Sequence, residues 1–407
     1  MRICFLILAA SGLLAQSAEA PKLLTYGTTN IAGGGSSFAL SMTPDGRRVV
    51  FASHANNLVT NDDLRSYSDI FIRDRFTGVT SLVSVNTNGS GGGDGNSGYA
   101  SISDNGRYVV FSSDAGNLVS HDTDGLSDVF RRDLHSGTTE LVSVGLAGGV
   151  PSPSLSAPIG GASKPVMTAN GRWIAFESAS IDLVTGDTNS TRKVFVRDMR
   201  QKTTFLASVG TYRSWSPSLS ANGRRVAFLA VAADIFPGRT NITGDVFMRD
   251  LQASTTSWVS TNVAEILANT NYTCRHPALA PNGDFVVFKA RTNGYSRAPT
   301  HVLHHDLTTG ITTLLATNSY PNTAAQLSTD SQWLAFEENG NIYLRDLLNR
   351  TNLLVSADLA GNPPPTGGSH SPVVTSGARF VAFVSSAPNL VADGVTDTNS
   401  FYLYVRD

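Results

Sequence analysis

The sequence is poor in cysteine, and this limits how the fold can be held together. Only Cys4 and Cys274 occur among its 407 residues. Cys4 lies in an apolar start that we expect to be removed, which leaves Cys274 without a partner. We therefore expect stability from burial and strand pairing rather than from disulfides. Cys274 itself is expected to be a buried small hydrophobe.

Charge is also scarce, which argues against a nucleic-acid partner. Charged residues make up 15% of the chain, against about 25% in ordinary globular domains. The formal net charge is −2, and no basic stripe is present, so nucleic-acid binding is not expected. Beyond the apolar start, no apolar run is long enough to cross a bilayer, and we expect no transmembrane segment in the mature chain.

Several catalytic signatures are missing as well. The chain has no Gly-x-Ser-x-Gly elbow, no phosphate-binding loop, no dinucleotide fingerprint and no Cys-x-x-Cys motif. A fused serine peptidase, a nucleotide-binding enzyme and a dithiol oxidoreductase are therefore not expected. The glycine-rich run at 89–95 is expected to be a loop, because no helix is predicted after it.

The chain begins with features of a secretory signal. Met1 and Arg2 precede an apolar run over 3–14, and small residues follow over 15–20. We interpret residues 1–18 as a signal peptide and residues 19–407 as one domain. Cleavage after Ser17, Ala18 or Ala20 remains open. The expected location is periplasmic or extracellular.

A repeated unit is the strongest signal in the sequence. It reads small-x-[Asp/Asn]-Gly-Arg-x-[Val/Ile]-[Val/Ala]-Phe, and its last two copies are degenerate. Successive copies are 47 to 65 residues apart, and all seven end in phenylalanine: Phe51, Phe111, Phe176, Phe228, Phe288, Phe336 and Phe383. A unit that recurs seven times at spacings of this order indicates a repeat architecture.

A second unit, close to [Val/Ile]-[Phe/Tyr]-x-Arg-Asp, follows each phenylalanine. Its aspartates are Asp74, Asp133, Asp198, Asp250, Asp306, Asp346 and Asp407. In the fifth copy His305 replaces the arginine. Because these Arg-Asp pairs recur so evenly, we interpret them as structural rather than as one active site.

Each repeat predicts four antiparallel strands. Asp-Gly or Asn-Gly between β-rich runs is a strong hairpin signal, since glycine accepts positive φ without cost. The first strand precedes this turn, the second reaches the phenylalanine, the third ends at the aspartate, and a fourth follows a polar turn. Seven such units predict an all-β fold, a seven-bladed β-propeller of four-stranded antiparallel blades.

The ring is expected to close through the N-terminal part of the chain. The seventh copy has no fourth strand after Asp407, whereas residues 22–26 form a β-rich segment outside any repeat. We predict that this N-terminal strand completes the last blade and hides its edge.

The repeats resemble the WD40-like unit of the TolB family of β-propellers, which is similar to Ser-Pro-Asp-Gly-x-x-[Ile/Val]-x-Phe followed by [Ile/Val]-[Tyr/Phe]-x-x-Asp. The copy Thr43-Pro-Asp-Gly-Arg-Arg-Val-Val-Phe51 shows the likeness. The resemblance covers almost all of the mature chain and implies the fold. It implies little about function, since such propellers serve both as binding scaffolds and as parts of enzymes. No counterpart of TolB's N-terminal α/β domain is expected, so its Tol–Pal partnership is not carried over.

Long connections between the second and third strands carry the acidic candidates. Asp122, Asp124 and Asp128 follow the second-repeat strand, and residues 182–189 repeat part of the pattern. Carboxylates of this kind suit Ca²⁺, which prefers hard oxygen ligands. The alternative is that Asp-Thr-Asp-Gly is only a turn, since the spacing differs from that of an EF-hand loop.

The histidines support a rival, enzymatic hypothesis. His54 and His121 fall in long connections, and His276 and His370 precede first strands of their repeats. The rival is a metal-dependent polysaccharide-active enzyme, similar to oligogalacturonate lyases, which use a metal and histidines on a propeller face. No local His-x-x-x-His spacing supports it. Surface or hairpin roles are the alternative.

We therefore expect an exported, non-enzymatic and monomeric scaffold. In an antiparallel blade, the connections between second and third strands and those between blades emerge on one face. Because function tends to sit on variable loops over a rigid frame, a protein, peptide or glycan ligand is expected on this long-loop face. The sixth repeat has only residues 337–341 between its middle strands, which predicts a gap there.

Overall fold

The structure is a computed structural model, and it describes residues 22–23, 37–60, 67–122, 124–150, 161–236, 243–293, 299–319, 323–391 and 401–407. The expected signal peptide at 1–18 lies outside the described residues. So do residues 24–26 of the expected closing strand.

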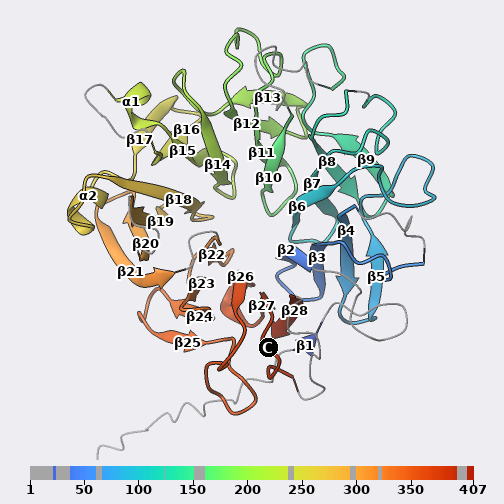
Figure 1. Cartoon of the computed structure of the whole chain (residues 1–407). Coiled ribbons are helices and arrows are strands. Elements are labelled where there is room, and N and C mark those ends of the chain that lie inside the picture. The colour runs from blue at the N-terminus through green and yellow to red at the C-terminus, as the bar shows by residue number, and fades with distance from the viewer. Residues whose placement is uncertain are drawn as a thin grey trace, which may run out of the picture.

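The described strands form seven four-stranded antiparallel sheets arranged around a ring, so the seven-bladed β-propeller is confirmed (Figure 1). The first three blades are β2 (Ser37–Met42), β3 (Arg48–Ser53), β4 (Asp69–Asp74) and β5 (Val79–Leu82); β6 (Ser97–Ile102), β7 (Tyr108–Ser113), β8 (Asp128–Asp133) and β9 (Thr138–Leu141); and β10 (Ser163–Met167), β11 (Trp173–Ser178), β12 (Lys193–Asp198) and β13 (Thr203–Leu206). In these three blades the second strand runs two residues beyond its phenylalanine.

The next three blades repeat the pattern. They are β14 (Ser214–Leu219), β15 (Arg225–Ala230), β16 (Asp245–Asp250) and β17 (Thr255–Trp258); β18 (Tyr272–Leu279), β19 (Phe285–Thr292), β20 (Thr300–Asp306) and β21 (Thr312–Ser319); and β22 (Gln326–Leu327), β23 (Trp333–Glu338), β24 (Asn341–Asp346) and β25 (Asn352–Leu354). Two one-turn helices, α1 (Ala232–Ile235) and α2 (Val263–Ile266), lie in connections of this region and were not expected.

The seventh blade joins the two ends of the chain. It contains β26 (Ser369–Val374), β27 (Val381–Ser385) and β28 (Tyr402–Arg406), with a 3₁₀ turn at Ser376–Ala378. The fourth strand is β1 (Lys22–Leu23), which pairs antiparallel with β28 so that Lys22 faces Val405 and Leu23 faces Tyr404. The predicted closure by the N-terminal strand is confirmed.

The repeated phenylalanines form the core between blades. All seven are fully buried. Phe51, for example, stacks on Phe71 of its own blade at 5.8 Å between ring centroids. It also belongs to a buried cluster with Ala382 and Leu403 of the seventh blade. Burial of a side chain of this size contributes about 2–3 kcal/mol, and the stacking adds to it.

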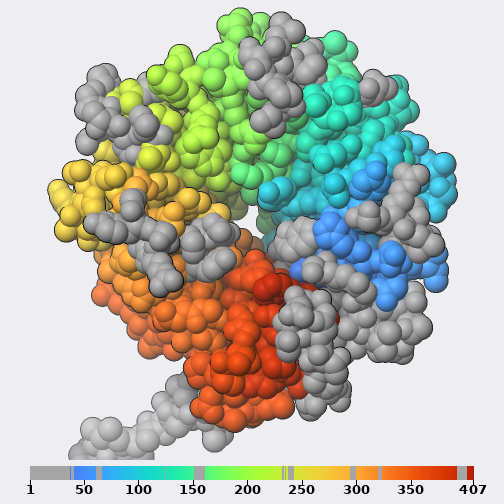
Figure 2. Space-filling model, viewed as in Figure 1, coloured from blue at the N-terminus to red at the C-terminus, as the bar shows by residue number. Residues whose placement is uncertain are grey.

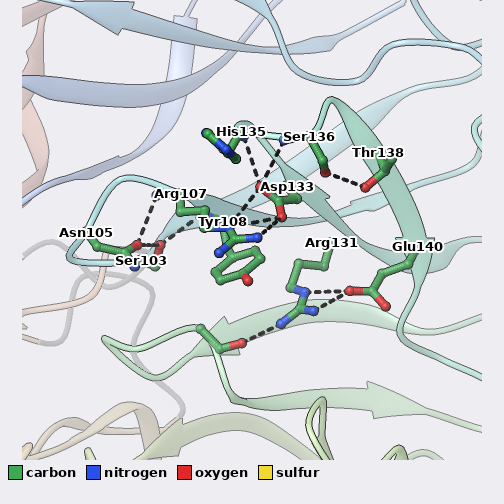
Figure 3. Close-up of polar contacts among 11 residues, drawn as sticks. Ser103, Asn105, Arg107, Tyr108, Arg131, Asp133, His135, Ser136, Thr138 and Glu140 are labelled. Atoms are coloured by element: carbon green, nitrogen blue, oxygen red, sulfur yellow. Dashed lines mark hydrogen bonds and ion pairs between the residues drawn. The ribbon is translucent and has the colours of Figure 1, made fainter.

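The aspartate of the Arg-Asp motif joins the two tight hairpins of its blade where it pairs with the arginine of the first repeated unit. In the second blade, Arg107 donates to both carboxylate oxygens of Asp133, and Asp133 also accepts from the backbone N–H of His135 at 2.9 Å (Figure 3). The arginine that follows Asn-Gly thus pairs with the aspartate that opens the next turn. The same ion pair recurs as Arg47–Asp74, Arg172–Asp198, Arg224–Asp250 and Arg379–Asp407. The structural interpretation of these aspartates is supported.

The innermost strands contain a β-bulge that was not predicted. In the fifth blade the register shifts between Arg275 and Ala278. His276, inside this bulge, has a φ of 49°, in the left-handed region. Equivalent residues of four other blades have the same conformation: Tyr99, Lys164, Ser216 and Ser371. Because the same conformation recurs in five blades, it belongs to the shared bulge of the inner strand rather than to one functional site.

Candidate functional site

The long connections and the tight turns lie on opposite faces. The Arg107–Asp133 pair spans the two tight turns of its blade and marks the first face, the tight-turn face (Figure 3). The other face, the long-loop face, carries the connections between second and third strands and those between blades. Where the inner strands of the blades meet, the molecular surface is hollowed (Figure 2).

The sixth blade is the predicted exception on the long-loop face. Its middle strands pair as far as Glu338 and Asn341, with only Asn339 and Gly340 between them. Both turn residues have positive φ, as a two-residue hairpin turn requires. The shortness of this connection is confirmed.

The three aspartates named from the sequence come together in the second blade. One carboxylate oxygen from each of Asp122, Asp124 and Asp128 lies within 4.8 Å of the others. Asp128 begins β8 and accepts from the Ser143 hydroxyl at 2.5 Å. Asp124 accepts from the backbone N–H of Leu126 at 2.9 Å, which fixes the turn.

Asp122 and Asp128 are buried, with exposed fractions of 4% and 1%. Neither oxygen of Asp122 makes a hydrogen bond, and Oδ2 of Asp128 also lacks one. The Asp124 N–H faces the Asp122 carboxylate and partly stabilises its charge, but without good hydrogen-bond geometry. Burial, reinforced by the neighbouring carboxylates, raises the pKa of Asp122 to about 6, and mainly burial raises that of Asp128 to about 7.

A second charged group lies on the inner hairpin of the fifth blade. Arg275 on β18 faces Lys289 on β19, and Arg291 follows two residues along the same strand. Directly opposed residues and residues two apart share one side of a sheet. Three cationic side chains therefore lie on one side of this hairpin, toward the long-loop face. We call them the blade-five cations.

The blade-five cations differ in their surroundings. Lys289 is fully buried, donates to Thr323 at 3.3 Å and is attracted by Glu337 of the sixth blade. Burial nevertheless lowers its pKa to about 8. Within the described part of the chain, the Nε atoms of Arg275 and Arg291 have no hydrogen-bond partner. Burial, and then the charge of Arg291, lowers the pKa of Arg275.

The equivalent position in the third blade shows how such a charge can be satisfied. Glu177 follows the core phenylalanine of that blade, as Lys289 does in the fifth. Its carboxylate pairs with Lys164 at 3.4 Å and with Arg192 at 3.1 Å, and it accepts from the Ser216 N–H at 2.8 Å. The fifth blade instead places like charges together, a pattern suited to an anion.

The histidines are not gathered into one group within the described residues. Among the described residues, the one group of three or more histidine, cysteine or carboxylate side chains close enough to hold an ion is the aspartate cluster. His276 and His370 lie within inner strands rather than before them. His305 contacts Thr312 at 2.8 Å, where Arg132 contacts Thr139 in the second blade. This histidine takes over the structural role of the arginine that it replaces.

Two grooves lie in the region of the first two blades. One of about 530 Å³ is lined by the long connections at 85–89 and 118–121 and by the outer strand β9, as far as Gly137 in the tight turn. On the tight-turn face, another of about 780 Å³ is lined by residues such as Arg48, Ile72 and His135. The tight-turn face is therefore hollowed in this region.

Comparison with solved structures agrees with the fold. An oligogalacturonate lyase in complex with manganese is 12% identical, with a TM-score of 0.60 over 96% of this chain and 94% of that chain. An oligogalacturonate lyase from Vibrio parahaemolyticus is 11% identical, with a TM-score of 0.58 over 96% and 97%. TolB from Acinetobacter baumannii is also a neighbour, 13% identical, with a TM-score of 0.45 over 77% and 64%.

No family model matches the sequence, and no curated protein does either. At such low identities the structural likeness shows the propeller alone. In the described residues, no helix is long and apolar enough to cross a membrane.

Proposed function

We propose that this protein is an exported, non-enzymatic scaffold that binds an anionic ligand on its long-loop face, with an acidic glycan as the preferred class. The observation that carries the proposal is the placement of Arg275 and Arg291 as diagonal neighbours on one side of a single hairpin, with Lys289 directly opposite Arg275. A guanidinium group presents paired N–H donors that match a carboxylate or sulfate. An anion between the two arginines would remove their mutual repulsion.

The short sixth blade favours an extended ligand. The blade-five cations lie on the side of their sheet that faces this blade, as the contact between Lys289 and Thr323 indicates. The sixth-blade hairpin ends at Asn339 and Gly340, so it adds no long loop over that side. A chain-like ligand can therefore approach the cations from the long-loop face. The expected export rests on the signal-like sequence at 1–18.

Binding of acidic oligosaccharides, measured by calorimetry, tests the proposal. Oligogalacturonate is the first probe, with a neutral oligosaccharide and a poly-glutamate peptide beside it. We expect affinity for the acidic sugar to fall as salt is raised. It should weaken on the order of tenfold or more when Arg275→Ala and Arg291→Ala are combined.

The matched control removes two exposed arginines from the tight-turn face, Arg200→Ala together with Arg350→Ala. This variant has the same net charge as the test variant and should bind like the unmodified protein. Equal binding by both double variants would overturn the proposed site. Binding of poly-glutamate but not of the acidic sugar would shift the ligand class to peptides.

A metal-dependent polysaccharide lyase is the second candidate. The observation in its favour is the position of His276, which follows Arg275 on the innermost strand of the fifth blade. The two oligogalacturonate lyases named above have the same fold. A lyase would release unsaturated sugar ends, which absorb ultraviolet light. Metal-dependent appearance of that absorbance, lost in His276→Ala, would favour this function over pure binding.

A further inference from the structure

The aspartate cluster of the second blade has a counterpart in the third blade that already contains a cation. Asp122, Asp124 and Asp128 are spaced like Asp187, Asn189 and Lys193. The strand register agrees. Asp128 pairs with Ser113 and Lys193 pairs with Ser178, and in each blade this pair joins the first residue of the third strand to the last residue of the second. The turn geometry agrees too, since Asn189 accepts from the Thr191 N–H as Asp124 does from that of Leu126.

In the third blade a lysine ammonium occupies the centre of this loop. Lys193 forms an ion pair with Asp187, and it donates to the backbone carbonyl of Asn189 at 3.0 Å. Both side chains are buried. The loop is therefore built around one buried positive charge that is held by a carboxylate and a carbonyl oxygen.

The second blade has the same loop without its cation. An aspartate stands in place of Lys193, so the loop gains one negative charge and loses one positive charge. Asp122 is buried, with only 4% of its surface exposed, yet neither of its carboxylate oxygens makes a hydrogen bond. Oδ2 of Asp128 also lacks a hydrogen-bond partner. Among the described residues, none makes an ion pair with Asp122, Asp124 or Asp128. Asp94, from the preceding connection between blades, adds further negative charge near Asp122.

We propose that the second blade binds one Ca²⁺ ion between Asp122, Asp124 and Asp128, at the place that the Lys193 ammonium fills in the third blade. Three carboxylates supply hard oxygen ligands, which Ca²⁺ prefers. By equivalence with Asn189, the backbone carbonyl of Asp124 is a fourth oxygen donor. The remaining positions suit water, because Asp124 is only partly buried.

A bound ion would also organise the neighbouring groove. His121 precedes Asp122 directly and lines the groove of about 530 Å³, together with Leu118 and Val119. Ca²⁺ would neutralise the clustered carboxylates and fix the loop that forms this wall. The site thus adjoins the wall of this groove that residues 118–121 form, and it does not depend on the blade-five cations.

Calcium titration of chelator-treated protein tests the site, with calorimetry for stoichiometry and thermal unfolding for stability. We expect one Ca²⁺ per chain and a rise in the unfolding midpoint, since an ion bound to the folded state stabilises it. Affinity on the order of 10⁻⁴–10⁻³ M or tighter is expected, the range of extracellular calcium modules. Asp122→Asn should weaken it at least tenfold. No binding at about 10 mM, or Mg²⁺ binding as tightly as Ca²⁺, would overturn the assignment.

Two loop exchanges make the test specific. The double variant Asp124→Asn with Asp128→Lys copies the third blade. It should lose the calcium response, with an unfolding midpoint in chelator at or above that of the unmodified protein. The reverse variant, Asn189→Asp with Lys193→Asp, should bind two Ca²⁺ per chain. An undiminished calcium response in the first variant would refute the site even if the reverse variant failed to fold.

Discussion

The ring of Phe380 in the last blade lies against Gly46 in the first, and a β-carbon on Gly46 would come within 2.2 Å of Cδ2 of Phe380. Gly46 belongs to the Asp-Gly turn and has a φ of 67°. The same relationship joins Tyr108 to Gly171 and Trp173 to Gly223. The residue that follows the motif arginine of one blade thus packs onto the turn glycine of the next. The repeated glycine serves both the turn and the contact between blades.

Replacing such a glycine should therefore cost more than its backbone conformation alone. Gly171→Ala is expected to lose roughly 1–2 kcal/mol from its left-handed conformation. A further loss of about 1–3 kcal/mol should come from displacing Tyr108. Gly310→Ala is the matched control, because Gly310 has a φ of 71° but nothing within 4 Å of an added β-carbon. Urea unfolding should separate the two variants, and equal losses would contradict the packing role.

The sequence predicted the turn but not this contact, for a physical reason. Asn-Gly specifies a hairpin through its local φ preferences, so the turn at Gly171 could be predicted from adjacent residues. The neighbour Tyr108 lies in another repeat, and its position depends on how blades pack. Likewise, the aspartate cluster is nearly contiguous in sequence and could be named in advance. Its counterpart in the third blade was also visible in the sequence, because Lys193 has the same spacing from Asp187 as Asp128 has from Asp122.

The blade-five cations could not be predicted from the sequence. Whether Arg275 and Lys289 share one side of a sheet depends on the bulge at His276, because a shift by one residue exchanges the two sides. The bulge residues differ between blades, from Tyr99 to Lys164 to Ser216. No side-chain pattern therefore marks the bulge in the sequence.

Removing one core phenylalanine should destabilise the ring strongly. Phe176 is fully buried and packs with Val110 and Val129 of the second blade. Phe176→Ala is expected to lower the free energy of unfolding by about 3–5 kcal/mol, through lost burial and the resulting cavity. The control Phe76→Ala removes a side chain that is 88% exposed, and it should change stability by less than about 0.5 kcal/mol. Similar losses for both variants would contradict the assigned strand register.

The Arg107–Asp133 pair should make stability depend on acid. The Arg107 guanidinium holds the pKa of Asp133 well below its ordinary value of 3.8, helped by backbone N–H donors. Because the folded-state pKa is lowered, the pair stabilises the protein above pH 3.8, and this contribution is lost as the pH falls below that value. Arg107→Gln should therefore be less stable at pH 7, with a difference that narrows toward pH 2–3. The difference should be modest and salt-sensitive, since Arg107 is half exposed. A difference that stays constant between pH 7 and pH 3 would show that the charge of Asp133 is not involved.

Closure through β1 gives the last prediction, which compares two starting points of the chain. A chain beginning at residue 21 keeps Lys22 and Leu23, whereas one beginning at residue 30 leaves the N–H and C=O groups of β28 unpaired on that edge. An exposed β28 edge would both destabilise the seventh blade and offer a template for pairing with another chain. We expect the shorter chain to unfold at a lower temperature and to self-associate, as measured by calorimetry and light scattering. A synthetic peptide covering residues 21–29, added in excess, should restore part of the lost stability. If both chains melt at the same temperature, β1 contributes no closure, and the ring is held by packing between the first and last blades alone.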